Sequence, residues 1–375
     1  MASIKRRSDG KWRARYRDPD GKEHAGHFPT RRDAERWLDL VRGDLVRGEY
    51  LDPDAGKVAL EAWARRWLAT VRPTLKPSTV ASYESLLRSR IYRRFGTTTL
   101  AAIRPSDVQE WLGEMTSAGI SASRVRKCAV VLKMIMDAAV RDNLIRSNPV
   151  TGVEPPRIER HEAAYFSPDV VDRIAAAMPT DEYALLVRVL GIGGLRFGEA
   201  AALTRDRVDL VRKRLLVRES VTEVAGRLVR TSTKTYQHRQ VPLSPTVAAA
   251  LTAHLDARVD PQSDAPVFQS PMGGWLRYQA FHGRVWTPVL DDLELPNVGL
   301  HVLRHSAAAR MIQAGASPKT VQAILGHRSA AFTLTVYGHL FDTDLDDLAA
   351  CLDAPADHSR TTAVDLDERR ASRTA

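Results

Sequence analysis

Three side chains capable of phosphate and proton chemistry share one short segment, in the order His301, Arg304 and His305. Positions three and four residues apart lie on the same face of an α-helix, so the spacing predicts one chemically active helix face. A guanidinium group binds phosphate oxygens through paired hydrogen bonds, and imidazole exchanges protons near neutral pH. Each of these residues also occurs on helices without a catalytic role, so the segment needs partners elsewhere in the chain.

A second arginine follows a glycine-rich segment that runs from Gly191 to Arg196 and Glu199. The glycines favour the end of one helix and a tight turn that presents Arg196 at the start of the next. Glu199 is placed to hold that guanidinium group, although such a pair in isolation is more often structural. The segment half-matches a dinucleotide fingerprint, but Arg196 replaces the third glycine and a helix precedes it, which excludes that function.

Three further residues complete the set of chemical candidates. Lys234 lies in a polar segment between predicted strands, a short helix ends at Gly326-His327, and Tyr337 follows ten residues later. Of the nine tyrosines, only Tyr337 lies beyond the histidine and arginine segment. A phenol with an ordinary pKa of about 10 is protonated at neutral pH. Tyr337 therefore needs a base or strong electrostatic help to act as a nucleophile.

The elements that must position these residues form a predicted domain over 166–348. Ser167 and Pro168 are typical of a helix start, and the helical pattern is interrupted over 215–243 by β-branched strands around turns at Ala225-Gly226 and near Lys234. The segment predicts a mainly α-helical domain with a small antiparallel sheet. We expect a linker over 151–165 before it and a mobile polar tail over 349–375 after it.

The first 55 residues predict a small domain of different composition. Apolar residues alternate with three arginines in one segment, and turn signals flank it, as expected for the middle strand of a three-stranded sheet. The arginines on that face are Arg13, Arg15 and Arg17. A helix over Thr30 to Arg47 would cover the other face, which carries Trp12 and Tyr16. The row of arginines suits DNA phosphates, and a solvated sheet face is the alternative.

Residues 58–150 predict an all-helical domain with 15 basic and 7 acidic residues. Ser78 is predicted as one helix cap, and Ser106 with Gln109 as the capping box of another. A longer helix is expected to open at Ser123. Three basic residues cluster at its start, namely Arg124, Arg126 and Lys127. Such a helical bundle fits a DNA clamp and equally fits a solvated face.

Overall charge points in the same direction. The 375 residues include 55 basic and 45 acidic ones, a net charge of +10. The segment 341–375 holds nine acidic and four basic residues, so positions 1–340 carry +15. A basic body suggests a polyanionic partner, and a solubilising surface is the alternative. With only two cysteines, the chain cannot form a disulfide framework or, from cysteines alone, a four-ligand zinc site. No apolar run fits a signal peptide or a membrane span. These features predict a cytoplasmic protein without a membrane partner.

The ordered combination of these motifs resembles the phage integrase (tyrosine recombinase) family over residues 160–345. The two N-terminal segments resemble, less specifically, the helical core-binding domain and the arm-binding domain of the larger phage integrases. The resemblance implies a multidomain α+β protein. It has an arm domain over 1–55 with a three-stranded sheet plus helix, an all-helical core-binding domain over 58–150, and a mainly α catalytic domain over 166–348.

The resemblance also implies roles for individual residues. Tyr337 would attack a DNA phosphodiester, forming a 3′-phosphotyrosyl enzyme and freeing a 5′-hydroxyl group. Arg196 and Arg304 would neutralise the oxygens of the transition state. Lys234 would protonate the leaving 5′-oxygen, with Lys213 as a distant rival for that role.

The three histidines of the motifs take acid–base and hydrogen-bonding roles in the same comparison. His301 would act in acid–base chemistry near the nucleophile, and His327 would donate a hydrogen bond to the phosphate. Glu199 would support Arg196. His305 and His339 are expected to be supporting residues.

Cofactors and partners follow from the same chemistry. Exchange of a phosphodiester for a phosphotyrosine conserves the bond, so no ATP, metal or other cofactor is expected, and no acidic triad for Mg²⁺ is evident. The expected partners are double-stranded DNA attachment sites, a synaptic homotetramer, a directionality factor and a host DNA-bending protein. The acidic segment Asp342 to Asp347, with apolar leucines through Leu352, predicts a tail helix that packs on a neighbouring subunit.

Two other functions remain open at this point. A type IB topoisomerase shares the active-site chemistry but relaxes supercoils instead of exchanging partners. A catalytically inert DNA-binding regulator would need the basic surfaces but not a complete set of catalytic residues. The arm segment favours the integrase, because a second DNA-binding module lets one protein bridge two sites.

Overall fold

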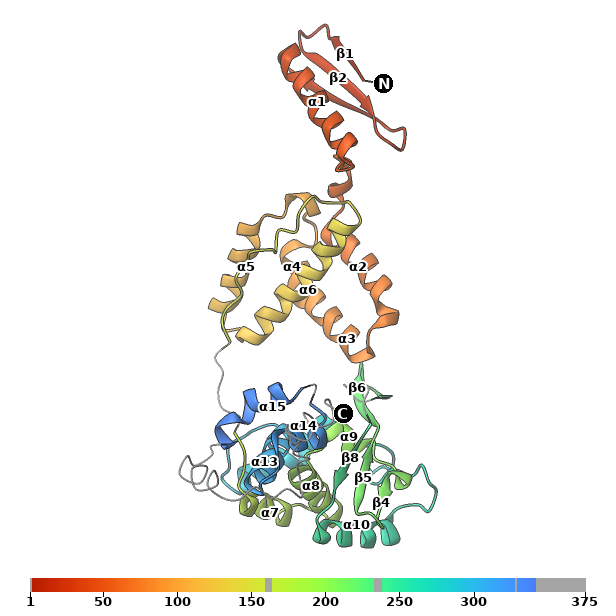
Figure 1. Cartoon of the computed structure of the whole chain (residues 1–375), viewed down its shortest axis with the longest axis vertical. Helices are drawn as coiled ribbons and strands as arrows, with labels where there is room; N and C mark the ends of the chain where they lie inside the picture. The colour runs from red at the N-terminus through yellow and green to blue at the C-terminus, as the bar shows by residue number, and fades with distance from the viewer. Residues whose placement is uncertain (1, 159–163, 233–237, 328, 342–375) are drawn as a thin grey trace, which may run out of the picture. The chain divides into compact units, whose positions relative to one another are not determined.

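The computed structural model describes residues 2–158, 164–232, 238–327 and 329–341. Contacts divide the chain into two compact units, Met1–Arg160 and His161–Ala375 (Figure 1). Part of the predicted linker, Lys234, the predicted tail helix and the tail over 349–375 lie outside the described residues. The multidomain α+β fold with small antiparallel sheets that the sequence predicts is confirmed.

The first unit begins with an antiparallel sheet in the order β1-β2-β3, covered on one face by helix α1. These elements are β1 (Ser3–Arg6), β2 (Trp12–Arg17), β3 (Glu23–Phe28) and α1 (Arg31–Arg47). Ala14 and Tyr16 are buried against Ala34 and Leu38 of α1. Thr30 caps α1 by accepting a hydrogen bond from the backbone of Asp33. The predicted sheet, helix and face assignment are therefore present.

The remainder of the first unit is helical. Its main helices are α2 (Leu60–Val71), α3 (Pro77–Leu86), α4 (Tyr92–Phe95), α5 (Pro105–Ser117) and α6 (Ala122–Arg141). Shorter turns are η1 (Ala55–Lys57), η2 (Arg72–Thr74), the π-helical η3 (Leu87–Ile91) and η4 (Leu100–Ala102). Helix α6 packs against α2 and α5, and the Trp63 indole donates a hydrogen bond of 3.1 Å to the carbonyl of Ile135.

The predicted caps of two of these helices were wrong. Helix α3 begins at Pro77 with Lys76 as its cap, so Ser78 lies inside the first turn. Helix α5 begins at Pro105, and the Asp107 carboxylate accepts from the backbone N–H of Arg104 in place of the predicted capping box of Ser106 and Gln109. Proline has a fixed φ and lacks an N–H group, which suits the first helical position and moves the cap to the preceding residue. Helix α6 begins at Ala122, one residue before Ser123.

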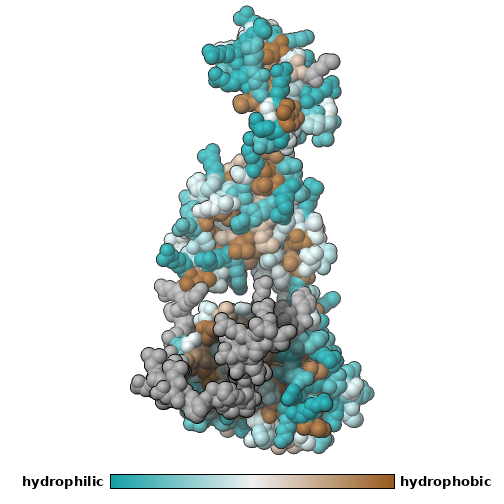
Figure 2. All heavy atoms as spheres, in the orientation of Figure 1, coloured by the Kyte–Doolittle hydropathy of each residue, from teal (hydrophilic) through white to brown (hydrophobic). Residues whose placement is uncertain are grey.

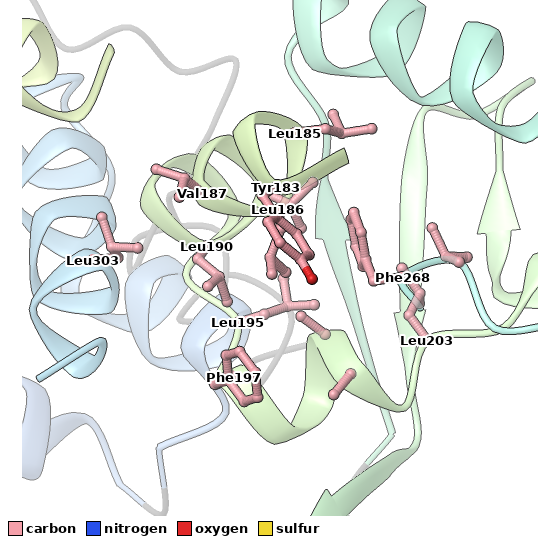
Figure 3. Packing of buried hydrophobic residues seen from close by; sticks show 14 of the residues in the cluster. Tyr183, Leu185, Leu186, Val187, Leu190, Leu195, Phe197, Leu203, Phe268 and Leu303 are labelled. Atoms are coloured by element: carbon pink, nitrogen blue, oxygen red, sulfur yellow. The ribbon is translucent and has the colours of Figure 1, made fainter. Parts of the chain in front are cut away.

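The second unit is mainly helical. Its helices are α7 (Pro168–Ala176), α8 (Asp181–Gly193), α9 (Phe197–Ala201), α10 (Pro245–Arg258), α11 (Tyr278–Phe281), α12 (Thr287–Asp292), α13 (His301–Gln313), α14 (Pro318–Leu325) and α15 (Ala330–Tyr337). Shorter turns are η5 (Arg205–Arg207), the π-helical η6 (His282–Trp286) and η7 (Gly338–Phe341). Helix α8 lies at the centre, where Leu186 and Leu190 pack beside Phe197 and Leu303 (Figure 3).

Five short strands lie among the described residues of this unit. A three-stranded antiparallel sheet has the order β4-β5-β8, with β4 (Val208–Asp209), β5 (Arg214–Val217) and β8 (Arg239–Pro242). A separate hairpin pairs β6 (Glu219–Val224) with β7 (Arg227–Ser232). Its turn has left-handed backbone at Ala225 (φ 49°) and Gly226 (φ 77°), as the sequence predicts. The single predicted sheet is thus two sheets among the described residues.

Polar residues dominate the visible face of the first unit, with apolar residues scattered among them (Figure 2). Within the described ranges, none of the helices combines the length and the apolar character that crossing a bilayer requires.

Candidate active site

The first arginine of the site stands at the start of a short helix, as its sequence predicts. Helix α8 ends at Gly194, whose left-handed φ of 70° turns the chain toward α9. A Cβ atom at Gly194 would lie 2.5 Å from Leu325, so only glycine fits this turn. Arg196 is the cap of α9, and its Nη1 donates to Glu199 Oε1 at 2.8 Å. The support of Arg196 by Glu199 inferred from spacing is present as a contact.

Glu199 is a buried anion held by two cations. Its side chain is 1% exposed, whereas that of Arg196 is 27% exposed. Burial raises the pKa of the Glu199 carboxyl group, but the hydrogen bonds and charge of Arg239, together with Arg196, lower it to about 2. Glu199 therefore stays ionised throughout the physiological range. The guanidinium group of Arg196 remains partly open to a ligand.

Helix α13 supplies the second arginine. The side chain of Arg304 is buried, and its two Nη atoms donate to the carbonyl oxygens of Gly194 at 2.6 Å and Leu325 at 2.5 Å. Burial, followed by the positive charge of Arg196, lowers the pKa of Arg304 to about 9, which leaves it protonated at neutral pH. Arg304 thus joins the end of α8 to the end of α14 and keeps a positive charge beside Arg196.

The hydroxyl group of Tyr337 lies 2.7 Å from Nδ1 of His305. Burial raises the pKa of Tyr337 to about 12, with Arg304 acting in the opposite direction, so the phenol carries its proton. Burial and the charge of Arg304 lower the pKa of His305, so its imidazole is uncharged near neutral pH. We therefore assign the tyrosine hydroxyl as the donor and the imidazole nitrogen as the acceptor.

The other two histidines frame this pair. The ring of His301 meets that of His305 edge to face, with 4.9 Å between centroids. The ring of His327 stacks on Tyr337 at 6.3 Å, and its Nδ1 lies 2.9 Å from the hydroxyl oxygen of Thr333. Burial lowers the pKa of His327 to about 3, and the charge of Arg304 adds to this effect. His327 is therefore an uncharged, packed residue in the absence of DNA.

The structure brings most of the predicted catalytic residues together and adds a buried arginine beside them that the sequence did not reveal. Arg239 of β8 binds both carboxylate oxygens of Glu199. The available signal was its position in the strand, two residues from the buried Val241, where an inward charged residue needs a buried partner. Lys234 lies outside the described residues, Lys213 lies exposed in the turn between β4 and β5, and His339 lies exposed in η7.

The predicted arginine row of the first unit lies on the uncovered face of its sheet. Arg13 and Arg17 are exposed and Arg15 is half-buried, opposite in alternation to the buried residues of β2. Strand register places Lys5 and His27 on either side of Arg13, so the basic surface is wider than β2 alone. Neither flanking residue was identified from the sequence. We call these five residues the arm surface.

The three predicted basic residues at the start of α6 do not all lie on one helix face. All are exposed, but only Arg124 and Lys127, three residues apart, share a helix face. Arg126 donates to the carbonyl oxygen of Pro156 at 3.2 Å instead.

Comparison with known proteins agrees with this site. Residues 164–344 match the phage integrase family, residues 59–116 match its N-terminal SAM-like domain, and residues 2–47 match its N-terminal domain. A protein named as a prophage phiRv2 integrase in Mycobacterium tuberculosis is 29% identical over 95% of this chain and 96% of its own length.

Two solved structures show the same fold. A Tn1549 transposon integrase in complex with transposon right end DNA has a TM-score of 0.68 and 20% identity, over 79% of this chain and 99% of that one. A lambda integrase tetramer bound to a Holliday junction has a TM-score of 0.60 and 20% identity, over 87% and 96% of the two chains.

These matches define the class of protein as a tyrosine recombinase. The chain belongs to the phage integrase family, and it is an integrase of the phage or mobile-element type.

Proposed function

We propose that this enzyme recombines two specific DNA sites through a 3′-phosphotyrosyl link on Tyr337. The observation that carries the proposal is the contact between the Tyr337 hydroxyl and His305, beside the buried cation Arg304. A tyrosine with a raised pKa is a poor nucleophile until its proton is removed, and His305 is placed to remove it. Nucleophile and base are thus adjacent before DNA binds.

The residues of the motif account for every bond and every proton of the cleavage step. The Tyr337 oxygen bonds to phosphorus while the bond from phosphorus to the 5′-oxygen breaks, and the tyrosine proton moves to Nδ1 of His305. We assign protonation of the leaving 5′-oxygen to Lys234, which follows β7 in the sequence. Attack by a 5′-hydroxyl group of another strand then reverses each bond change, so religation needs no external energy source.

Arg196 and Arg304 are assigned to the nonbridging phosphate oxygens. Both guanidinium groups are fixed by protein acceptors before substrate arrives, Arg196 by Glu199 and Arg304 by two backbone carbonyls. A donor held in this way stabilises developing charge without reorganisation, and removal of one typically costs ~10²–10³ in rate. We assign His301 and His327 to the same phosphate as hydrogen-bond donors.

Double-stranded DNA attachment sites are the proposed substrates, and four copies of the chain the proposed synaptic assembly. The support is the fold shared with an integrase bound to transposon DNA and with a tetramer bound to a Holliday junction. We assign the core-binding role to residues 58–150 and the arm-binding role to residues 1–55. A directionality factor and a host DNA-bending protein are proposed as accessory partners, and the nucleoid as the place of action.

Substitution of the nucleophile tests this function. Tyr337→Phe is expected to bind core-site DNA with unchanged affinity but to give no covalent product on a nicked substrate resolved under denaturing conditions. Tyr183→Phe removes a hydroxyl group from the α8 core and is the matched control, which should still cleave. Covalent product from Tyr337→Phe contradicts the assignment. Relaxation of supercoiled DNA by the unmodified enzyme, without recombinants from paired sites, indicates a topoisomerase.

A further inference from the structure

Arg239 is a buried cation at the start of β8 that no catalytic motif includes. Its side chain is only 6% exposed, and it extends from the position paired with Val217 of β5. A charged side chain withdrawn from water requires hydrogen-bonded partners for its donors. The partners of Arg239 therefore reveal what the residue does.

The guanidinium group has three hydrogen bonds. Its Nη1 and Nη2 donate to the two carboxylate oxygens of Glu199 at 3.0 and 2.5 Å, which is a paired arginine–carboxylate contact. Its Nε donates to the carbonyl oxygen of Ile324 at 2.7 Å. One side chain of β8 thereby joins helix α9 to the end of helix α14.

Both contacts lead directly to the phosphate-binding residues. Glu199 also accepts from Arg196 Nη1 at 2.8 Å and from the Arg196 backbone at 2.9 Å. Ile324 precedes Leu325, whose carbonyl oxygen accepts from Arg304. The next residue, Gly326, packs so closely that a Cβ atom there would lie 3.0 Å from Cδ of Arg239.

We propose that Arg239 is a positioning residue for DNA cleavage: it orients Glu199, and through it Arg196, while it fixes the Leu325–His327 segment. The proposal rests on the function proposed above. Arg239 has no assigned contact with the substrate and acts only through its neighbours. Without it, Glu199 keeps a single cationic partner and draws Arg196 toward itself, away from the phosphate.

Two substitutions at this position separate geometry from charge. Arg239→Lys retains the buried positive charge beside Glu199 but cannot bind both carboxylate oxygens and Ile324 in the same plane. Arg239→Gln also removes the charge. Because displacement of a catalytic group by about 1 Å can cost ~10²-fold in rate, we expect single-turnover cleavage to fall at least ~10-fold for Arg239→Lys and ~100-fold for Arg239→Gln. Core-site affinity should stay within about threefold of the unmodified enzyme.

Arg205 provides the matched control. It is an arginine of the same unit whose Nη1 donates to the carbonyl oxygens of Leu255 and Val259 at 2.7 and 3.4 Å, at the end of α10. Arg205→Gln is expected to lower the melting temperature. Cleavage by this variant should be unchanged when it is measured about 20 °C below the melting temperature, where both variants are folded. A loss of cleavage that merely follows loss of stability would affect both arginines alike and overturn the proposal.

A double-mutant cycle with Arg196→Lys shows whether the effect passes through Arg196. If Arg239 acts by orienting Arg196, Arg239→Lys costs much less in the Arg196→Lys background than in the unmodified enzyme. Additive losses, or cleavage by Arg239→Lys at the unmodified rate, overturn the proposal. Failure of the proposed function can be distinguished from failure of this proposal, because the former would appear as covalent product from Tyr337→Phe.

Discussion

The hydroxyl of Tyr337 and the imidazole of His305 are the proposed nucleophile and general base, and their atoms lie 2.7 Å apart. General-base removal typically costs ~10²–10⁴ in rate. His305→Gln retains a hydrogen-bond acceptor but cannot take up the proton, so we expect a loss in that range in single-turnover cleavage with DNA affinity retained. His282→Gln, at a histidine of the η6 turn, is the control. A fully active His305→Gln would assign the base elsewhere.

His305 should also set how the cleavage rate falls as the pH is lowered. A base acts in its unprotonated form, and burial keeps the pKa of His305 below the usual value of 6.5. We therefore expect cleavage to persist at pH 6.5 and to decline only at lower pH, measured as the single-turnover rate from pH 8 to pH 5, about the range in which ordinary histidines titrate. A decline centred above pH 6.5 would contradict a half-buried His305 that is unprotonated at neutral pH.

His327 links this site to stability. Burial lowers its folded-state pKa from 6.5 to about 3, so the unfolded chain binds a proton first as the pH falls. Its contribution to stability is present above pH 6.5 and is progressively lost toward pH 3. Between pH 7.5 and pH 5.5 we expect this one residue to remove roughly 1 kcal/mol from the free energy of unfolding. His327→Gln should show a smaller decrease in denaturant titrations, and equal decreases would contradict the assignment.

The sequence predicted which residues lie together in the site but not which side chains contact one another. The order of the motifs, through the family resemblance, singled out Arg196, Arg304 and Tyr337, and the structure brings these three residues together. The resemblance implied acid–base chemistry near the nucleophile for His301, whereas His305 is the histidine that accepts a hydrogen bond from Tyr337. Both histidines share a helix face, and only the tertiary packing of α15 on α13 decides between them. Arg239 was missed because its partners are 40 and 85 residues away.

At the level of elements, local sequence signals succeeded where one residue decides the conformation. The helix starts at Thr30 and Ser167 were predicted, and in both cases the hydroxyl group caps the helix by accepting from an N-terminal N–H. Prediction failed at α3 and α5, where proline takes the first helical position and lets a lysine or arginine stand at the cap. The split into two sheets depends on pairings between distant strands, which hydrophobic alternation does not encode.

Two glycines that end neighbouring helices give a matched test of an element. Gly326 ends α14 and Gly315 follows α13, with left-handed φ values of 67° and 80°. A Cβ atom at Gly315 would meet open space, whereas one at Gly326 would press on Arg239. Alanine at either position is destabilising by roughly 1–2 kcal/mol, because a Cβ atom disfavours the left-handed backbone conformation.

We therefore expect Gly326→Ala and Gly315→Ala to lower the free energy of unfolding by comparable amounts, but only Gly326→Ala to slow cleavage. Denaturant unfolding and single-turnover cleavage of the two variants check this. Equal cleavage rates would mean that the end of α14 does not transmit its geometry to the active site.

At the scale of the whole molecule, the second unit carries the proposed catalytic residues and the arm surface gives the chain a second candidate DNA contact. Arg13 and Arg15 each lie near Glu23, at 3.7 and 3.5 Å. Such exposed ion pairs contribute little to stability, typically ~0–1 kcal/mol, so a DNA phosphate can replace Glu23 at small cost. The two arginines of the arm surface are thus only weakly held by Glu23.

This surface yields a prediction about salt. Each phosphate contact releases counterions and contributes up to ~0.9 to the slope of log affinity against log salt concentration. Arg13→Ala combined with Arg15→Ala should weaken binding of an arm-site duplex and reduce that slope by up to ~1.8. Core-site cleavage by the second unit should remain, because these residues belong to the first unit.

Removal of equal charge from the helix of the same domain is the control. Arg42 and Arg47 are exposed on α1, which covers the opposite face of the sheet, and each pairs with an acidic neighbour on that helix. Arg42→Ala with Arg47→Ala should leave the salt slope of arm-site binding unchanged if the sheet face contacts the phosphates. Because both double variants lose two positive charges, a general electrostatic attraction would reduce the two slopes equally. Only a difference between them places the duplex on the arm surface.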